Sequence, residues 1–241
     1  MTGSLVSPEL RARVRGLMEP VALGLGRVGL TPNALTVIGF LIACIAAGAA
    51  AAQAWLVAGL LVLFGGVFDL FDGALARATN KVSRLGAFMD STFDRAGEAV
   101  VYVGIIAGTG HAFWPLGGDT IGNLSLLAAA AMAASFMVSY TRAKAESLGF
   151  TGGTGMANVG LAPREVRIVL LALGLILTGI GGGVCTTGDC GFFSTETPLG
   201  PRHDGADFLA GALGIIALLA TITTIQRIVH TINQAAKQEQ G

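Results

Sequence analysis

The sequence predicts an all-α membrane protein with six transmembrane helices and an amphipathic helix before the first of them. Of its 241 residues, 53% are hydrophobic and only 12% are charged, whereas a soluble domain carries about 25% charged residues. No charged residue lies between Val28 and Phe68, and this stretch is too long for one transmembrane helix of about 20 residues. The 36 glycines are typical of membrane helices that pack through small residues. We therefore expect a single membrane domain over residues 1–241.

Turns and polar segments divide the apolar sequence into six spans. Thr31 is a suitable cap for the first helix, and Pro32 suits its first helical position. The alanine-rich region before Trp55 is the natural turn inside the long uncharged stretch, and we expect Trp55 at the membrane interface. The glycine-rich or polar connections cover 109–123, 149–163, 182–205 and a frayed tail after Asn233, and the predicted spans cover 33–52, 55–78, 85–108, 122–147, 164–181 and 206–232.

Residues 7–26 are expected to form an amphipathic helix that lies in the membrane interface. Its apolar positions share one face, and its arginines lie off that face, where they would meet anionic headgroups. An ordinary soluble helix is the alternative. The apolar positions are Leu10, Val14, Leu17, Met18 and Val21, and the arginines are Arg11, Arg13 and Arg15.

The distribution of basic residues predicts the orientation. Six spans place both termini on one side of the membrane, and positive charge favours the cytoplasmic side. Nearly all Lys and Arg fall in one set of segments, whereas the opposite set holds only Arg202. We therefore expect a multi-pass protein of the cell membrane with both termini in the cytoplasm. The zero net charge gives no electrostatic reason for nucleic-acid binding.

The stretch from Asp69 to Asp94 places four carboxylates in this apolar sequence. Asp69 and Asp72 are three residues apart and project from one helix face, and Asp90 and Asp94 are four apart on the next helix. A carboxylate at mid-bilayer costs roughly 2.5–3.5 kcal/mol, so a compensating cation is expected. Two helices packed antiparallel would bring the four carboxylates together. The alternative is that they are helix-end charges paired with nearby arginines.

The residue types of this stretch favour a hard divalent cation. Oxygen ligands suit Mg²⁺, Mn²⁺ or Ca²⁺ better than Zn²⁺, and the stretch contains no His or Cys. Four carboxylates could hold two ions, the arrangement that clamps phosphoryl groups. Gly73 and Gly86 leave room for a ligand near the backbone, and Arg77 is placed to meet a phosphate. We expect two ions of Mg²⁺ or Mn²⁺.

These residues form the pattern D-x-x-D-G-x-x-A-R-x8-G-x3-D-x3-D, which resembles the signature of the CDP-alcohol phosphatidyltransferase family at every fixed position. The resemblance implies a membrane enzyme in which an alcohol attacks a CDP-linked lipid such as CDP-diacylglycerol, with release of CMP. It also implies six helices around a polar cavity that opens to the cytoplasm, and a homodimer.

By the same resemblance, Asp69, Asp72 and Asp90 bind the metals, while Asp94 completes the metal site and acts as the general base on the acceptor hydroxyl. A carboxylate must be poised by its neighbours to serve as a base. The resemblance also assigns a set of residues to the CDP-lipid, although Pro-Asn before a helix is equally common as a plain cap. This set is Asn33, Ala34, Leu35, Thr36, Gly73, Arg77 and Ser83.

Four arginines lie at the cytoplasmic ends of the last three spans. Each one alone would serve as an anchor on the positive side of the membrane. Together they could form one anion pocket, because guanidinium groups suit phosphomonoesters. We therefore expect a phosphorylated polyol as the acceptor. The arginines are Arg142, Arg164, Arg167 and Arg227.

A narrower resemblance concerns the acceptor. The patches Ser-Tyr-x-Arg-Ala-Lys-Ala-Glu, Arg-x-x-Arg-Ile and Gln-Arg are similar to actinobacterial phosphatidylinositol phosphate synthases and their archaeal counterparts, which use inositol 1-phosphate. The chain departs from the mycobacterial pattern, since Arg142 precedes Lys144 where that pattern has Lys then Arg, and Val166 replaces a Glu. The resemblance places the acceptor phosphate on Ser139, Arg142, Arg164, Arg167 and Arg227.

Three alternatives stay open from the sequence. A phosphatidylglycerophosphate synthase that uses glycerol 3-phosphate would need the same phosphate pocket. A cation transporter would also place carboxylates inside a helix bundle, although no acidic path continues through the last three spans. A catalytically dead relative is the third alternative, but no motif position is lost.

The cysteines predict little chemistry. Cys185 and Cys190 fall in the 182–205 loop on the outer side, where they could close a small disulfide. Cys44 lies within the first span and is expected to pack there.

Overall fold

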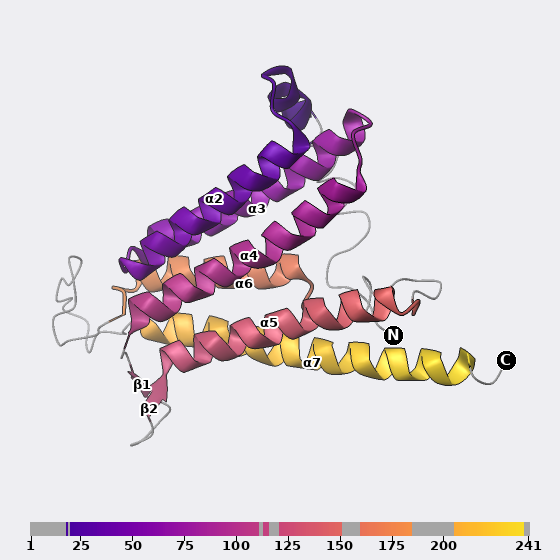
Figure 1. Ribbon diagram of the computed structural model, residues 1–241. Helices are drawn as coiled ribbons and strands as arrows, with labels where there is room; N and C mark the ends of the chain where they lie inside the picture. The colour runs from indigo at the N-terminus through magenta and orange to yellow at the C-terminus, as the bar shows by residue number, and fades with distance from the viewer. Residues whose placement is uncertain are drawn as a thin grey trace.

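The computed structural model describes Met18, residues 20–110, 124–150, 160–184 and 205–238, together with the backbone of two short strands. Residues 20–27 are helical and lead into six helices and a hairpin (Figure 1). The helices are α2 (Pro32–Ala51), α3 (Trp55–Ala78), α4 (Arg84–Thr109), α5 (Leu124–Ser147), α6 (Arg164–Ile180) and α7 (Ala206–Gln238), and the strands are β1 (Phe113–Pro115) and β2 (Ile121–Asn123).

The six helices match the six predicted spans to within a few residues at most ends. The hairpin is a difference, because β1 and β2 pair antiparallel within a segment predicted as a loop. The last helix also differs, since α7 continues to Gln238 instead of fraying after Asn233. Of the predicted amphipathic helix at 7–26, only Met18 and residues 20–26 are described, and Cys185 and Cys190 lie outside the described residues.

Two helix starts follow the capping chemistry of the sequence. The Thr31 hydroxyl accepts a hydrogen bond from the Ala34 amide at 3.2 Å at the start of α2. The Ser83 hydroxyl accepts one from the Gly86 amide at 2.9 Å at the start of α4. Side-chain caps of this kind satisfy amides that have no partner within the helix.

The helices form two groups, which are connected by α6 and by the packing of α4 on α5 (Figure 1). In the first group, α2 packs along both α3 and α4, whereas α3 and α4 touch each other little. In the second group, α5 and α7 lie side by side. The helix α6 packs on α3 and on α7. The expectation that α3 and α4 pack directly on each other was therefore wrong, because each of them packs on α2 instead.

Glycine and alanine let the backbones approach closely. A Cβ on Gly104 would lie 2.2 Å from the carbonyl oxygen of Ala47, and a Cβ on Gly108 would lie 2.1 Å from that of Ala50. These contacts join α4 to α2, and small residues are the usual means of close helix approach in membranes. Trp55, the first residue of α3, is only 2% exposed, so its side chain packs against the core of the bundle.

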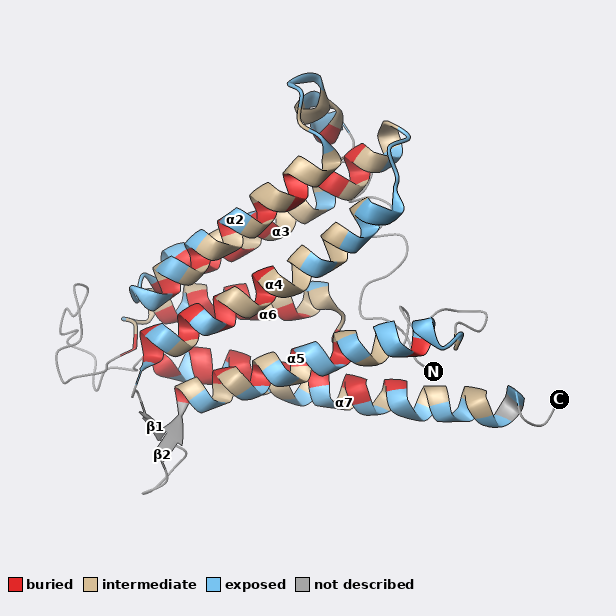
Figure 2. Ribbon diagram, in the orientation of Figure 1, coloured by how far each residue is buried: buried red, intermediate tan, exposed pale blue. Residues whose placement is uncertain are grey.

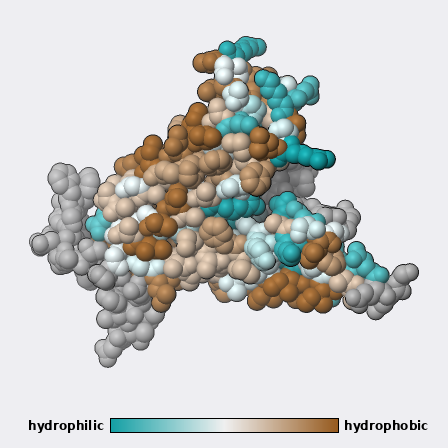
Figure 3. Space-filling model, viewed as in Figure 1, coloured by the Kyte–Doolittle hydropathy of each residue, from teal (hydrophilic) through white to brown (hydrophobic). Residues whose placement is uncertain are grey.

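The outer surface of the bundle is apolar. Buried residues line the inward sides of the helices (Figure 2), and hydrophobic residues cover much of the outside (Figure 3). Large exposed side chains such as Leu41, Ile45 and Leu60 point outward from α2 and α3. A contiguous apolar exterior of this kind is not tolerated in water, and it fits a lipid environment.

Four of the described helices are long and apolar enough to cross a membrane, namely α2, α3, α5 and α7. The other two differ for simple reasons. The helix α4 carries five charged residues, and α6 has 17 residues, slightly fewer than the roughly 20 that a perpendicular span needs. The chain is therefore a multi-pass membrane protein by the composition of its helices.

Gly104→Ala should destabilise the protein, because the added methyl group would collide with the α2 backbone. Overpacking of this kind costs about 1–3 kcal/mol, which corresponds to a loss of about 5 °C in melting temperature for a chain of this size. Thermal unfolding in detergent micelles measures the change. Gly48→Ala is the control, since a Cβ on the exposed Gly48 meets nothing within 4 Å; equal melting temperatures for the two variants would contradict the close packing of α2 and α4.

Candidate active site

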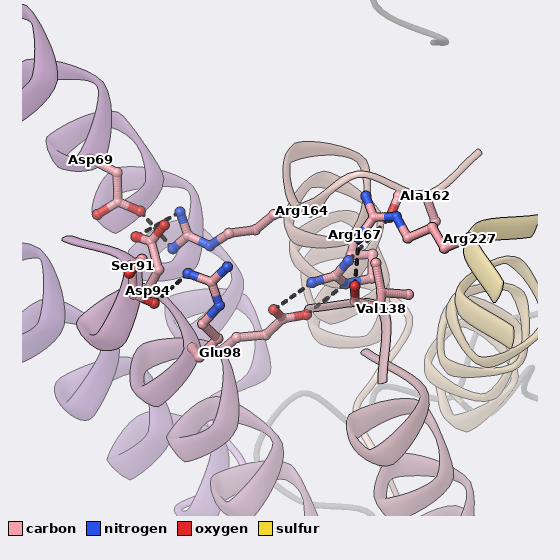
Figure 4. A network of polar contacts seen from close by, with 10 residues as sticks. Asp69, Ser91, Asp94, Glu98, Val138, Ala162, Arg164, Arg167 and Arg227 are labelled. Atoms are coloured by element: carbon pink, nitrogen blue, oxygen red, sulfur yellow. Dashed lines mark hydrogen bonds and ion pairs between the residues drawn. The ribbon is translucent and has the colours of Figure 1, made fainter. Parts of the chain in front are cut away.

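Arg164 brings two of the motif carboxylates together. It is the first residue of α6, and its guanidinium reaches Asp69 on α3 and Asp94 on α4 (Figure 4). Nη2 lies 2.7 Å from Asp69 Oδ2, and Nη1 lies 2.9 Å from Asp94 Oδ1. All three side chains are largely buried. A planar guanidinium can bind two acceptors at once, so one residue of α6 connects both halves of the aspartate motif.

Asp72 lies deeper than Asp69 and has a different partner. It is 5% exposed, and the Thr36 hydroxyl donates to its Oδ2 at 2.6 Å. A buried carboxylate needs such donors to offset the loss of water. Thr36 was predicted as a CDP-lipid residue, and the structure places it against one of the predicted metal ligands.

Asp90 lies one turn before Asp94 on α4 and is partly buried. It is within electrostatic range of Asp69 and Arg164. Among the described residues, no group of three or more His, Cys, Asp or Glu side chains is close enough to hold a metal ion. Of the four carboxylates, Asp69 and Asp94 are held on either side of Arg164, whose positive charge offsets their mutual repulsion.

The chemistry of these side chains fits a hard divalent cation. All the donors are carboxylate oxygens from two helices, which is the ligand type of Mg²⁺ and Mn²⁺. The backbone also leaves space, because a Cβ on Gly39 would lie only 3.0 Å from Asp69 Oδ1. A residue larger than glycine at this position would press on the carboxylate.

The predicted CDP-lipid residues fall into two small clusters and one core position. A Cβ on Gly86 would lie 3.0 Å from Ser83 Oγ and 3.4 Å from Asn33 Oδ1, so these residues are neighbours. A Cβ on Gly73 would lie 3.3 Å from Arg77 Nη1, so the Arg77 side chain folds back over the Gly73 backbone. Because Gly73 and Gly86 have no Cβ, a polar or cationic side chain can lie directly beside the backbone of each. Leu35 is fully buried and packs with Ala22, Ala74 and Leu75, so its side chain faces the core.

Glu98 is a site residue that the sequence analysis missed. It lies one turn after Asp94 on α4, and its carboxylate forms two hydrogen bonds with Arg167, at 2.9 Å from Nε and 2.8 Å from Nη2. Arg167 is 2% exposed and also donates from Nη1 to the Ala162 carbonyl at 3.0 Å. An acidic residue inside a predicted span needs a buried partner, and that was the signal available in the sequence.

Two parallel ion pairs therefore join α4 to α6. Asp94 pairs with Arg164, and one turn along both helices Glu98 pairs with Arg167 (Figure 4). The helix α4 packs mainly on α2 and α5, whereas α6 packs on α3 and α7. The link between α4 and α6 thus depends chiefly on these four side chains.

The remaining predicted acceptor residues come from α5 and α7. Arg227 is 4% exposed, and its Nη1 donates to the Val138 carbonyl at 2.5 Å. Arg142 pairs with Glu146 on the same helix at 2.8 Å and is more exposed. Arg142 and Arg167 both lie within electrostatic range of Arg227. Ser139 follows Val138 on α5 and is partly buried.

A cavity lies between α2, α3, α4 and α6. One end carries the charged groups Asp69, Asp94, Glu98 and Arg164, and the rest of its wall is apolar. Hydrophilic residues also gather between the two groups of helices in the space-filling view (Figure 3). A site that is charged at one end and apolar beyond it suits an amphipathic ligand. The apolar wall includes Phe40, Leu61, Val62, Phe93, Ile168 and Leu171.

The profile of one protein family, CDP-alcohol phosphatidyltransferase, matches residues 29–222. The chain belongs to the CDP-alcohol phosphatidyltransferase family. It is 36% identical over 176 residues to the archaetidylinositol phosphate synthase of Pyrococcus horikoshii, and the match covers 73% of this chain and 85% of that protein. It is 35% identical over 177 residues to the phosphatidylinositol phosphate synthase of Cutibacterium acnes, with 70% and 77% covered.

Solved structures agree with this assignment. The structure of the Mycobacterium tuberculosis phosphatidylinositol phosphate synthase with CDP-DAG bound matches with a TM-score of 0.67 and 25% identity, covering 89% of this chain and 92% of that one. A second structure of that protein, with manganese and citrate, matches with a TM-score of 0.67 and 24% identity and supports the fold. Membership in this transferase family decides against the cation transporter.

In this phosphatidyltransferase, Glu98→Gln should destabilise the fold strongly. Removing one partner of a buried ion pair leaves the other charge uncompensated and costs about 3–5 kcal/mol. The double substitution Glu98→Met with Arg167→Met should recover most of this loss, because an apolar pair of similar size carries no desolvation penalty. Thermal unfolding in micelles measures both effects.

The control for this comparison is Glu146→Gln, which breaks the exposed pair with Arg142. An exposed pair contributes about 0–1 kcal/mol, so the melting temperature should change little. A loss for Glu98→Gln no larger than that for Glu146→Gln would show that the buried pair does not stabilise the link between α4 and α6.

Proposed function

We propose that this chain transfers the phosphatidyl group of CDP-diacylglycerol to a hydroxyl of inositol 1-phosphate, giving phosphatidylinositol phosphate and CMP. The observation that carries the proposal is the position of Arg164, a predicted acceptor residue that contacts Asp69 and Asp94 of the aspartate motif. On this proposal, the residues for the donor and those for the acceptor phosphate share one site. The names of the relatives from Pyrococcus horikoshii and Cutibacterium acnes support inositol phosphate as the acceptor class.

Asp69, Asp72, Asp90 and Asp94 are the residues that would hold the metal, for which we propose two ions of Mg²⁺ or Mn²⁺. Bound metal would neutralise the diphosphate and stabilise the departing CMP. Asp94 would accept the proton of the acceptor hydroxyl as the hydroxyl oxygen bonds to the β-phosphorus. The bond between that phosphorus and the CMP oxygen breaks, and CMP leaves with the electron pair. A positioned carboxylate base contributes about 10²–10⁴-fold to such a step.

For the CDP-lipid, we propose that Arg77 meets the diphosphate beside the open backbone of Gly73. Asn33 and Ser83 would contact the nucleotide beside Gly86, where their side chains are neighbours. The stretch from Asn33 to Thr36 would contribute polar groups at its ends, while its Leu35 side chain stays in the core. The apolar wall of the cavity suits the start of the lipid chains.

For the acceptor phosphate, we propose Ser139, Arg142, Arg164, Arg167 and Arg227. Arg142 and Arg164 are the more exposed of these arginines, so they are best placed for direct contact. Arg167 already gives three N–H groups to protein partners, and a guanidinium has five. Because Glu98 neutralises its charge, its contribution would be the two N–H groups that remain.

In the membrane, we propose that all six helices α2–α7 span the bilayer. The residues 7–26 would lie along its cytoplasmic surface, and the site and both termini would face the cytoplasm. The basic residues gathered on that side support this orientation. A homodimer is proposed on the family resemblance alone.

The second candidate is a phosphatidylglycerophosphate synthase, because glycerol 3-phosphate carries the same phosphomonoester for the arginines. Release of CMP by the purified protein with CDP-diacylglycerol and Mg²⁺ separates the two. Turnover with inositol 1-phosphate, and none with free inositol or glycerol 3-phosphate, is the expected result. Turnover with glycerol 3-phosphate and with neither inositol compound would support the transfer reaction but contradict inositol 1-phosphate as the acceptor.

Asp94→Asn should abolish CMP release while CDP-diacylglycerol still binds. The amide cannot take the hydroxyl proton, so turnover should fall by about 10²–10⁴-fold. Single-turnover CMP release and equilibrium binding of the lipid measure the two effects. Asp207→Asn, at the exposed start of α7, should leave both unchanged. Equal losses of binding and turnover for Asp94→Asn would make Asp94 chiefly a metal ligand.

Arg142→Ala should raise the Michaelis constant for inositol 1-phosphate by at least about tenfold, because a charge-assisted hydrogen bond contributes about 1.5–3 kcal/mol. The constant for CDP-diacylglycerol should stay the same. Steady-state kinetics with each substrate varied in turn measures both. Glu146→Ala is the matched control, since it breaks the same ion pair and keeps Arg142. An equal rise in both constants would contradict the division of the site.

A further inference from the structure

The start of α6 has no side-chain cap of its own. Arg164 is the first helical residue, and the preceding Pro163 makes no side-chain capping bond. The N-terminus of a helix normally needs such a bond to fix the entry of the chain. The direction in which Arg164 leaves the backbone must therefore be set by groups from elsewhere in the fold.

Thr223 on α7 supplies the first of these groups. It is fully buried, and its Oγ1 accepts hydrogen bonds from the Leu161 amide at 3.1 Å and the Ala162 amide at 3.0 Å. A threonine hydroxyl has two lone pairs, so both can be used. The contact also requires glycine at 160, where φ is +121° and a Cβ would lie 2.2 Å from Thr223 Cγ2.

Glu98 on α4 supplies the second group through Arg167. The Ala162 carbonyl accepts from Arg167 Nη1 at 3.0 Å, and Glu98 fixes the same guanidinium with two further bonds. Ala162 is fully buried, so it has no access to water. The Ala162 N–H thus bonds to Thr223 of α7. The Ala162 C=O bonds to Arg167 of α6, and Glu98 of α4 fixes the guanidinium of Arg167. The residue lies two positions before Arg164.

We propose that Glu98 and Thr223 are positioning residues that together fix residues 160–163 and so set Arg164 against Asp69 and Asp94. Neither residue needs to touch a substrate for this role. The inference rests on the proposed function only in giving Arg164 a part in binding the acceptor phosphate. It adds that the alignment of that arginine depends on a hydroxyl of α7 and a carboxylate of α4.

Thr223→Val tests the inference with little change in volume. The substitution removes the acceptor of two buried amides, so hydrogen–deuterium exchange at Leu161 and Ala162 should become about tenfold faster. The Michaelis constant for inositol 1-phosphate should rise several-fold, while that for CDP-diacylglycerol stays the same. Thr223→Ser keeps the hydroxyl and should restore both measurements.

Thr221→Val is the control in the same helix. Its hydroxyl is exposed and donates only to the Ala217 carbonyl of its own helix at 2.8 Å, so exchange at 161 and 162 should not change. Glu98→Gln should speed exchange at Ala162 from the other side. Glu98→Gln is also expected to destabilise the whole protein, which would speed exchange everywhere. The test of the inference therefore depends on the Thr223 variants and on their melting temperatures.

Three outcomes are distinct. Faster exchange confined to the 160–167 region, with a higher acceptor constant and rescue by serine, supports the inference. Unchanged exchange at 161 and 162, or an equal rise across the whole chain, overturns it. Faster local exchange with an unchanged Michaelis constant for inositol 1-phosphate supports the fixing of residues 160–163 by Thr223. It overturns the proposed role of Arg164 in binding the acceptor phosphate.

Discussion

The bridge from Arg164 to Asp69 and Asp94 is the interaction on which the rest of the site depends. Carboxylates inside an apolar bundle need hydrogen-bond donors or a positive charge close to them. Arg164 provides that charge to two helices at once, with distances of 2.7 and 2.9 Å. The second pair, Glu98 with Arg167, repeats the arrangement one turn further along. The polar interior is thus built as two crossings between α4 and α6, of which the Glu98–Arg167 pair is neutral and the Arg164 bridge carries two carboxylates for one guanidinium.

The packing of the helices makes room for this polar interior. The helix α2 approaches α4 closely enough that backbone contacts replace side chains at Gly104 and Gly108. The same helix packs along α3, so it holds the two carrier helices of the aspartate motif at a fixed separation. The space that remains is a cavity with charged residues at one end. The close contact between α2 and α4 therefore exists beside a cavity that α3 and α6 also line.

The two groups of helices also divide the chemistry. Residues of α2, α3 and α4 carry the aspartates and the groups proposed for the CDP-lipid, whereas α5 and α7 carry Ser139, Arg142 and Arg227. Two contacts join the groups, the packing of α4 on α5 and that of α6 on both α3 and α7, and the first turn of α6 holds Arg164 and Arg167.

The sequence by itself determined the helices and the aspartate motif, because hydropathy, capping residues and short spacings are local properties of the chain. The bounds of α2, α3 and α6 and the predicted cap at Thr31 follow from neighbouring residues, whereas Ser83 was predicted to contact the CDP-lipid and caps α4 in the structure. Only the tertiary structure decided that α3 and α4 both pack on α2, that Arg164 bridges the carboxylates, and that Glu98 meets Arg167. Those partners are 69 residues apart for Glu98 and 95 for Asp69, and no periodicity connects positions at such separations. Their pairing is set by how the apolar faces pack, which brings buried charges to the few places where an opposite charge can reach them.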